Sequence, residues 1–367
     1  MATRAMLGIL AVGAALVAGL AAWAAFNFNR ELDEQRARIG GGSRLVETRC
    51  GAVEVGDVGE AGEATQTAAA AGASTPGGPG AAASTLPLLV VHGSGGGFDQ
   101  GLALGAGFAP RGWRVIAPSR FGYLRTPWPA DGGVSGERQA DQLVCLLDAL
   151  GVDAVAVLGV SAGAISATEF AVRHPQRTKA LILMVPAGYR PETTPPMPGW
   201  AQALLETVIS ADLPFWLISH LAPDVVRRFV LATPPAEYAA APEAERRRVD
   251  RMMREILPIS ARSRGLLHDT LATQRVPRPR LEAIRALTLA ISARDDGFGT
   301  LASAAYAAQT IPNARLLVFD RGGHLLLNHQ AEVVAAVEAL LREAAAGPMP
   351  TSPPAPAPAP PSTATPR

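Results

Sequence analysis

From Leu86 onward, short apolar segments alternate with segments of helical length, and this alternation limits the fold more than any other feature of the chain. Because the apolar segments are continuous, the sheet that they form must be covered on both faces. The order predicts an α/β fold with a mostly parallel sheet and helices on both sides. Strands are expected at 88–91, 115–117, 154–158, 180–185, 287–291 and 315–319, and helices at 137–150, 162–174, 300–311 and 330–346.

Three other parts of the chain set the domain boundaries. Residues 43–48 and 51–58 alternate apolar with polar side chains, as two antiparallel strands do. Residues 60–84 and 347–367 are rich in Ala, Gly, Pro and Thr, so we expect a disordered loop inside the domain and a flexible tail after it. The globular domain is therefore predicted to span 43–346.

A helical insertion is expected at about 190–280, because no strand candidate occurs there. Its predicted helices, broken by prolines, are Trp200–Leu221, Asp224–Leu231, Pro235–Ile256 and Ser260–Thr273.

The N-terminus carries an uninterrupted apolar run from Met6 to Phe26, long enough to cross a bilayer. We predict that residues 1–29 form a single membrane-anchoring helix and that 30–42 form a charged stalk. The alternative is a signal peptide cleaved after Ala22-Trp23-Ala24, which would export the protein. Arginines flank the run on both sides, so the positive-inside rule does not give the orientation.

Composition excludes several classes of partner. The 33 basic and 32 acidic residues give a net charge of +1, so no nucleic-acid partner is predicted. The two cysteines, Cys50 and Cys145, show no metal-ligand spacing, and Cys145 lies in an apolar helical run. We therefore expect no disulfide and no metal bound by cysteines.

Gly159-Val160-Ser161-Ala162-Gly163 has the form G-x-S-x-G and lies where a predicted strand meets a predicted helix. That context is typical of a nucleophile elbow, which holds a serine hydroxyl above the sheet edge. His92-Gly93-Ser94-Gly95-Gly96-Gly97 follows an earlier strand. This loop is the predicted place for one oxyanion donor, and the N–H of Ala162 is the predicted other donor.

A serine needs a base to accept its proton and an acid to orient that base. Among six histidines, His324 lies on the loop after the last predicted strand, and the chain order Ser, Asp, His favours it. The acid is expected after the preceding strand, where Asp295 and Asp296 are adjacent. Spacing alone does not choose between them.

These motifs resemble the α/β-hydrolase superfamily over about 43–346. The resemblance implies a mostly parallel eight-stranded sheet, a Ser/Asp/His triad and a helical cap after the sixth strand. The family's pattern of a small residue, two variable positions and the acid falls on Ser292 to Asp295, which selects Asp295. Pro118–Tyr123 and Ala171–Pro175 also match, whereas the elbow reads S-A-G where many members have S-M-G or S-L-G.

The resemblance implies a serine hydrolase that acts through an acyl-enzyme on a small molecule. It also implies an oxyanion hole made by the N–H groups of Ser94 and Ala162, and no metal or organic cofactor. A serine at the elbow argues against dehalogenase and epoxide-hydrolase chemistry, which uses aspartate. We expect cleavage of a carboxylic ester, with a carbon–carbon bond hydrolase for meta-cleavage products as one alternative and a non-catalytic binding protein as the other. The apolar cap predicts a hydrophobic substrate, with Gly95, Phe298 and Trp216 as candidate contacts.

Overall fold

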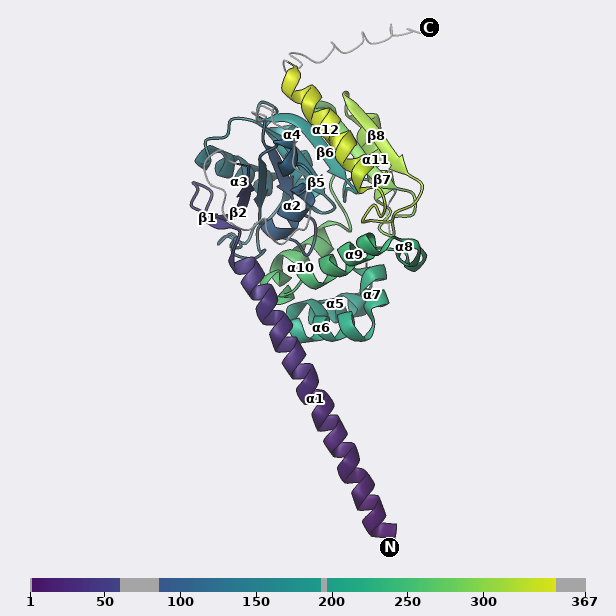
Figure 1. Ribbon diagram of the computed structural model, residues 1–367. Coiled ribbons are helices and arrows are strands. Elements are labelled where there is room, and N and C mark those ends of the chain that lie inside the picture. The colour runs from purple at the N-terminus through teal and green to yellow at the C-terminus, as the bar shows by residue number, and fades with distance from the viewer. Residues whose placement is uncertain (1, 60–85, 193–196, 348–367) are drawn as a thin grey trace, which may run out of the picture.

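A computed structural model of the protein describes residues 2–59, 86–192 and 197–347 (Figure 1). Its strands are β1 (Arg44–Val46), β2 (Val53–Val58), β3 (Leu88–Val91), β4 (Val115–Pro118), β5 (Val155–Val160), β6 (Thr178–Met184), β7 (Leu287–Ala293) and β8 (Ala314–Phe319). They form one eight-stranded sheet in the order β1-β2-β4-β3-β5-β6-β7-β8. β2 pairs antiparallel with β1 and β4, and the remaining pairs are parallel. The predicted α/β fold is confirmed.

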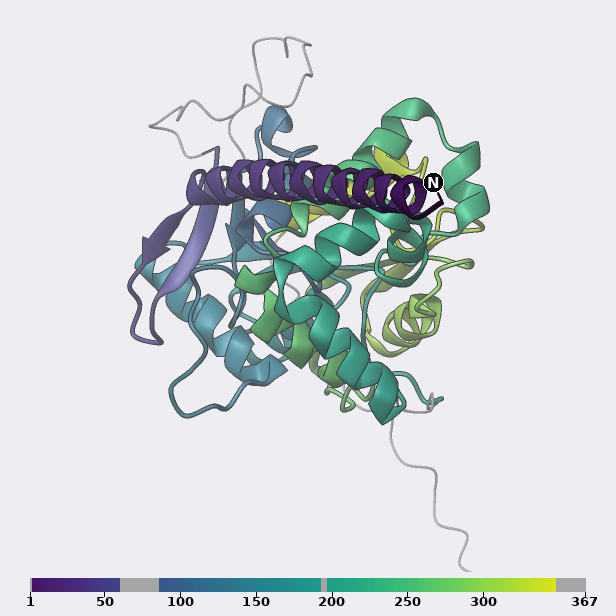
Figure 2. The ribbon, with the colours of Figure 1, turned by 90° about the horizontal axis from the view of Figure 1, so that it is seen from below.

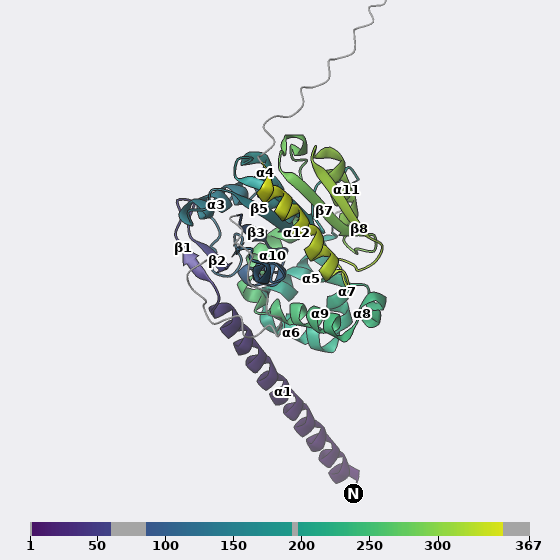
Figure 3. The same ribbon diagram turned by 45° about the horizontal axis from the view of Figure 1, so that its top comes forward.

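Five helices cover the two faces of the sheet: α2 (Phe98–Gly105), α3 (Gly136–Ala149), α4 (Gly163–Arg173), α11 (Thr300–Thr310) and α12 (Gln330–Ala346). Successive side chains of β3 point to opposite faces. Leu89 and Val91 pack in the core with α3, α4 and α11, whereas Leu88 and Val90 pack in the core with α12. Figure 3 shows α12 lying across its face of the sheet.

The cap follows β6 and consists of α5 (Gly199–Ser210), α6 (Asp212–Leu221), α7 (Pro223–Phe229), α8 (Pro235–Ala240), α9 (Glu243–Glu255) and α10 (Ser263–Ala272). Two of the predicted cap helices are each divided. The chain is extended at Ala211, because a continuous helix would place Pro214 where a backbone N–H is needed. Pro242 similarly separates α8 from α9.

The first helix, α1 (Ala2–Gly40), continues through the predicted stalk, which is therefore not a separate segment. Its C-terminal half packs on the cap, while its N-terminal half projects from the body of the molecule (Figures 1 and 2). Phe28 contacts Trp216 edge to face at 5.7 Å, and Trp216 Nε1 donates to Glu31 at 2.8 Å. Arg38 binds Asp99 at 2.7 Å.

Within the part of the chain that the structure describes, no single helix is long and apolar enough to cross a membrane. Only α5 and α6 together meet those requirements, with a bend of 101° between them. The predicted N-terminal anchor is not supported by this result.

Two predicted disordered segments fall largely outside the described residues. The internal loop at about 60–84 lies wholly outside them, and so does the tail except for Gly347. Their predicted disorder stays a prediction.

Cys50 and Cys145 form a disulfide, so the expectation of unpaired cysteines is wrong. The turn between β1 and β2 lies against α3, where Arg49 also binds Asp148 at 2.6 Å. This contact brings together two cysteines that are 95 residues apart. A count of cysteines does not contain that tertiary proximity.

We expect oxidised protein to show no free thiol when unfolded without reductant, and both thiols after reduction. Replacing both cysteines (Cys50→Ser with Cys145→Ala) should lower the free energy of unfolding by about 2–4 kcal/mol, because the long loop gains freedom in the unfolded chain. Thiol titration and denaturant unfolding measure the two effects. Two free thiols in the oxidised protein would contradict the pairing.

Candidate active site

Ser161 lies on a sharp turn between β5 and α4. Its φ of 50° is in the left-handed region, where a residue with a side chain is strained. Two glycines make the turn possible. A Cβ at Gly159 would lie 2.8 Å from Ala164 Cα, and one at Gly163 would collide with the carbonyl oxygen of Val91. The turn therefore has the strand–turn–helix geometry that a nucleophile elbow requires.

The backbone of Ser161 is held on both sides. Its N–H donates to Met184 O, and its carbonyl oxygen accepts from the N–H groups of Ala164 and Ala187, each at 3.0 Å. Among the hydrogen bonds of the described residues, none joins the Ser161 hydroxyl to His324. Catalytic hydrogen bonds of this kind often tighten only when substrate binds. The structure thus positions the hydroxyl without closing the predicted relay.

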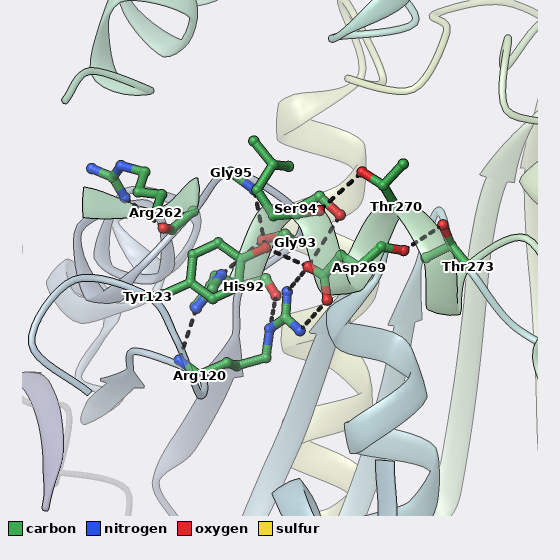
Figure 4. Close-up of polar contacts among 12 residues, drawn as sticks. His92, Gly93, Ser94, Gly95, Arg120, Tyr123, Arg262, Asp269, Thr270 and Thr273 are labelled. Atoms are coloured by element: carbon green, nitrogen blue, oxygen red, sulfur yellow. Dashed lines mark hydrogen bonds and ion pairs between the residues drawn. The ribbon is translucent and has the colours of Figure 1, made fainter. Parts of the chain in front are cut away.

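The glycine loop, residues 92–97, packs directly on this turn. A Cβ at Gly93 would lie 3.1 Å from Ser161 Cβ, so a larger residue would push the loop away from the nucleophile. Figure 4 shows the loop residues Gly93, Ser94 and Gly95 beside the cap residue Asp269.

Some backbone N–H groups near the nucleophile donate a hydrogen bond within the protein, and others do not. Three have acceptors: Gln100 Oε1 for Gly93 N–H (2.9 Å), the Tyr123 hydroxyl for Gly95 N–H (3.4 Å) and Gly93 O for Gly96 N–H (3.3 Å). The N–H groups of Ser94 and Ala162 donate to no acceptor within the described chain. These two amides are therefore available to an oxyanion, as the sequence predicts for them.

His324 lies on the loop between β8 and α12 and is nearly buried, with 9% of its side chain exposed. Its Nδ1 is 2.9 Å from Oδ2 of Asp296, whose side chain is fully buried. Phe298 N–H (2.9 Å) and the Thr300 hydroxyl also donate to this carboxylate. With Nδ1 donating to Asp296, Nε2 is left as the proton acceptor.

The acid that contacts His324 is thus Asp296, and the prediction of Asp295 is wrong. The Asp295 carboxylate instead accepts the N–H groups of Gly322 (3.2 Å) and Gly323 (2.8 Å), immediately before the histidine. The two neighbours point to different sides of the turn after β7. The family's spacing does not distinguish the two aspartates. Thr300, at the start of a helix, was the sequence signal for Asp296, because its hydroxyl can donate to a buried carboxylate four residues earlier.

Asp296 is held in its ionised form. Burial favours the protonated carboxyl, but the hydrogen bond and charge of His324, with the Thr300 hydroxyl, hold its pKa below the ordinary value. An ionised Asp296 keeps the Nδ1 proton of His324 in place and stabilises the imidazolium that forms during proton transfer.

Other histidines are engaged elsewhere. Burial, reinforced by Arg120, lowers the pKa of His92 to about 3, so this ring is neutral. His92 Nε2 accepts the N–H of Arg120 at 3.0 Å and has no capacity left to act as a base. His174 and His329 lie beside acidic side chains at 2.8 and 3.0 Å.

The three predicted substrate contacts differ in position. Phe298 is 46% exposed and contacts the His324 ring edge to face at 4.8 Å. Gly95 lies in the glycine loop. Trp216 is only 3% exposed and packs in the cap core against α1, so its predicted substrate contact is wrong.

A cavity of about 190 Å³ adjoins Ala162. Its wall is mainly apolar and includes the charged residues Glu137, Glu169, Arg275 and the paired Arg120 and Asp269. Ser161, His324 and Ser94 do not belong to the wall, so the cavity meets the catalytic turn at Ala162. Within the described residues, no group of three or more His, Cys, Asp or Glu side chains is placed to hold a metal.

The sequence also matches a known protein family. The sequence profile for the alpha/beta hydrolase fold matches residues 87–328, which is most of the chain. The chain belongs to the alpha/beta hydrolase family. The match covers the elbow, the glycine loop and His324, together with the whole cap.

Two curated relatives of this alpha/beta hydrolase are themselves named hydrolases. The 2-hydroxymuconate semialdehyde hydrolase of Pseudomonas putida is 29% identical over 70% of this chain and 88% of its own length. The 2-hydroxy-6-oxo-6-phenylhexa-2,4-dienoate hydrolase of Burkholderia cepacia is 28% identical over 65% of this chain and 80% of its own length. A solved alpha/beta hydrolase fold protein from Nakamurella multipartita has a TM-score of 0.60 at 27% identity and covers 83% of this chain and 100% of its own. The protein is therefore a hydrolase.

Changing Asp296 to Asn should lower kcat by about 10⁴-fold, because a neutral amide no longer favours the reactive tautomer of the histidine. Asp295→Asn is the matched control. It weakens only the support of the loop and should cost at most about 100-fold. Kinetics with p-nitrophenyl butyrate, on variants shown to be folded by circular dichroism, compare the two. A larger loss for Asp295→Asn would reverse the assignment.

Proposed function

We propose that this hydrolase cleaves a carbon–carbon bond in a small 2-hydroxy-6-oxo-dienoate acid, through an acyl-enzyme on Ser161. The observation that carries the proposal is similarity over at least 80% of the length of two relatives whose names specify such acids. A 2-hydroxy-6-oxo-dienoate contains no ester or amide bond. Hydrolysis of its carbon chain therefore breaks the carbon–carbon bond beside the 6-oxo carbonyl group.

In the proposed reaction, Ser161 Oγ attacks the carbonyl carbon at position 6 while its proton passes to His324 Nε2. The oxyanion binds the N–H groups of Ser94 and Ala162, and one such donor is typically worth about 3 kcal/mol. The C5–C6 bond then breaks in the 2-oxo tautomer of the substrate, in which the proton of the 2-hydroxyl group has moved to C5. Its electron pair delocalises onto the 2-oxo oxygen, and the resulting dienolate takes the proton from His324. Water, deprotonated by His324, attacks the acyl-enzyme and releases the acid and the serine.

Arg275 supports an acidic substrate. It lies on the wall of the cavity beside Ala162, where a guanidinium can pair with a carboxylate. Arg120 is not available for this role, because Asp269 neutralises it.

Cleavage of a carboxylic ester is the second candidate. Glu137 and Glu169 line the same cavity, and burial, with the charge of Glu137, raises the pKa of Glu169. A wall with these two carboxyl groups and a mainly apolar lining suits an uncharged substrate better than a dianion. Attack, oxyanion binding and deacylation would proceed on the same residues.

A substrate panel tests the first proposal. We expect kcat/KM for a 2-hydroxy-6-oxo-6-phenylhexa-2,4-dienoate to exceed that for p-nitrophenyl butyrate by at least about tenfold. Higher turnover of the ester would favour the second candidate. A fluorophosphonate should label the wild type but not Ser161→Ala, whereas absence of labelling would favour a non-catalytic binding protein.

We also propose that residues 6–26 attach the protein to a membrane, with the hydrolase domain on the non-cytoplasmic side. Leu16, Leu20 and Phe26 on α1 are each more than 60% exposed, which leaves apolar surface for lipid. The Cys50–Cys145 disulfide favours an oxidising compartment. Export after cleavage at Ala24 is the alternative.

Fractionation of cells that express the full chain tests this location. The protein should stay in the membrane pellet after an alkaline carbonate wash, and its intact mass should include the first 24 residues. Recovery of a shortened chain in the soluble fraction would favour the cleaved signal peptide.

A further inference from the structure

A buried polar cluster joins the cap to the glycine loop (Figure 4). Its centre is Asp269 on α10, which is 3% exposed. Asp269 Oδ1 accepts from Arg120 at 2.9 Å, and Oδ2 accepts from a second Arg120 nitrogen and from the hydroxyls of Tyr123 (2.5 Å) and Ser94 (3.2 Å). One carboxylate of the cap thus binds three residues of the catalytic domain.

The charges in this cluster keep the hydrogen bonds in one direction. Burial favours a neutral Asp269, but the ion pair with Arg120 holds its pKa below the ordinary value. Burial and the nearby Asp269 charge raise the pKa of Tyr123 well above its ordinary value, so the phenol keeps its proton. Tyr123 therefore donates to Asp269 while its oxygen accepts the N–H of Gly95.

The Ser94 N–H belongs to the Gly93–Ser94 peptide, and Ser94 and the residue after it are both tied to Asp269. Ser94 is bound through its hydroxyl, and Gly95 is bound through Tyr123. Gly95 has a φ of 72°, a conformation that rotates the peptide groups on either side of it. On its other side, Gly93 N–H donates to Gln100 Oε1 at 2.9 Å. The Gly93–Ser94 peptide is therefore restrained at both of its ends, which fixes the direction in which Ser94 N–H points.

A second cap residue supports the same loop from its other end. Arg262 is fully buried, and its Nη1 donates to Gly96 O at 2.5 Å while Nη2 binds Asp99 at 2.7 Å. The cap therefore holds the loop at Ser94, Gly95 and Gly96.

We propose that Tyr123 and Asp269 are positioning residues for the oxyanion hole, and that the cap aligns the Ser94 N–H through them. The inference rests on the proposed serine hydrolase chemistry. It makes the cap part of the catalytic apparatus rather than only a cover, because displacement of α10 releases the loop. The helix that carries Asp269 is accordingly a fixed wall of the site.

Tyr123→Phe tests this role with the loss of a single hydroxyl. We expect kcat for p-nitrophenyl butyrate to fall by about 10- to 100-fold with KM changed less than about twofold, as for a misaligned transition-state contact. The inhibition constant of phenylboronic acid, whose serine adduct places an oxygen in the oxyanion hole, should rise by a similar factor. Product inhibition should stay unchanged.

Tyr238→Phe is the matched control. Its hydroxyl also donates to a cap carboxylate, Asp250, at 2.9 Å, but far along the chain from the loop. Tyr238 is only partly buried, so this variant should lose no more stability than Tyr123→Phe, and it should keep its kcat. Asp269→Asn, compared with Asp250→Asn, should reproduce the same contrast.

Equal kcat and equal boronate affinity in the two tyrosine variants would overturn the inference. So would a loss in Tyr123→Phe that appears wholly in KM or is explained by unfolding at the assay temperature. Failure of the underlying chemistry is recognised separately, because wild-type protein would then resist fluorophosphonate labelling.

Discussion

The close approach of the elbow to the end of β3 determines the geometry of this hydrolase. Only a residue without a side chain fits at Gly163, because a Cβ would collide with the carbonyl oxygens of Val91 and His92. That contact presses the start of α4 against the glycine loop. As a result, the N–H groups of Ala162 and Ser94, from two separate strand ends, lie beside the same serine. The sheet order, with β3 next to β5, makes this approach possible.

Around this contact, three aspartates each have a defined partner. Asp296 binds His324, and Asp269 binds Arg120. Asp295 binds the two glycines that precede His324. Breaking one member of a buried pair leaves an unpaired charge, which costs several kcal/mol. These pairs therefore hold His324 and the glycine loop in fixed orientations. The mainly apolar cavity lies beside them, at Ala162.

Much of this arrangement is readable from the sequence. Continuous apolar strands predict the buried parallel sheet, and every predicted strand is present with its ends shifted by at most two residues. The G-x-S-x-G motif predicts the strained turn because its two glycines leave room where a Cβ would collide. Helix breaks at Pro214 and Pro242 were available in the sequence, but the apolar periodicity ran through them.

The wrong predictions share a cause, because each depends on how distant parts of the chain meet in three dimensions. Asp295 and Asp296 are adjacent, and only the path of the turn after β7 decides which carboxylate reaches His324. Cys50 and Cys145 meet because the first hairpin lies on α3. Asp269 showed no local signal at all, since its role depends on a cap helix meeting a loop 175 residues earlier.

A crystal structure of the phenylboronic acid adduct tests the central claim most directly. It should show boron bonded to Ser161 Oγ, one boronate oxygen within hydrogen-bond distance of the N–H groups of Ser94 and Ala162, and His324 Nε2 in contact with the adduct while Nδ1 remains on Asp296. An adduct whose oxygen points away from both amides, or an imidazole too distant to share a proton with Ser161, would contradict the account.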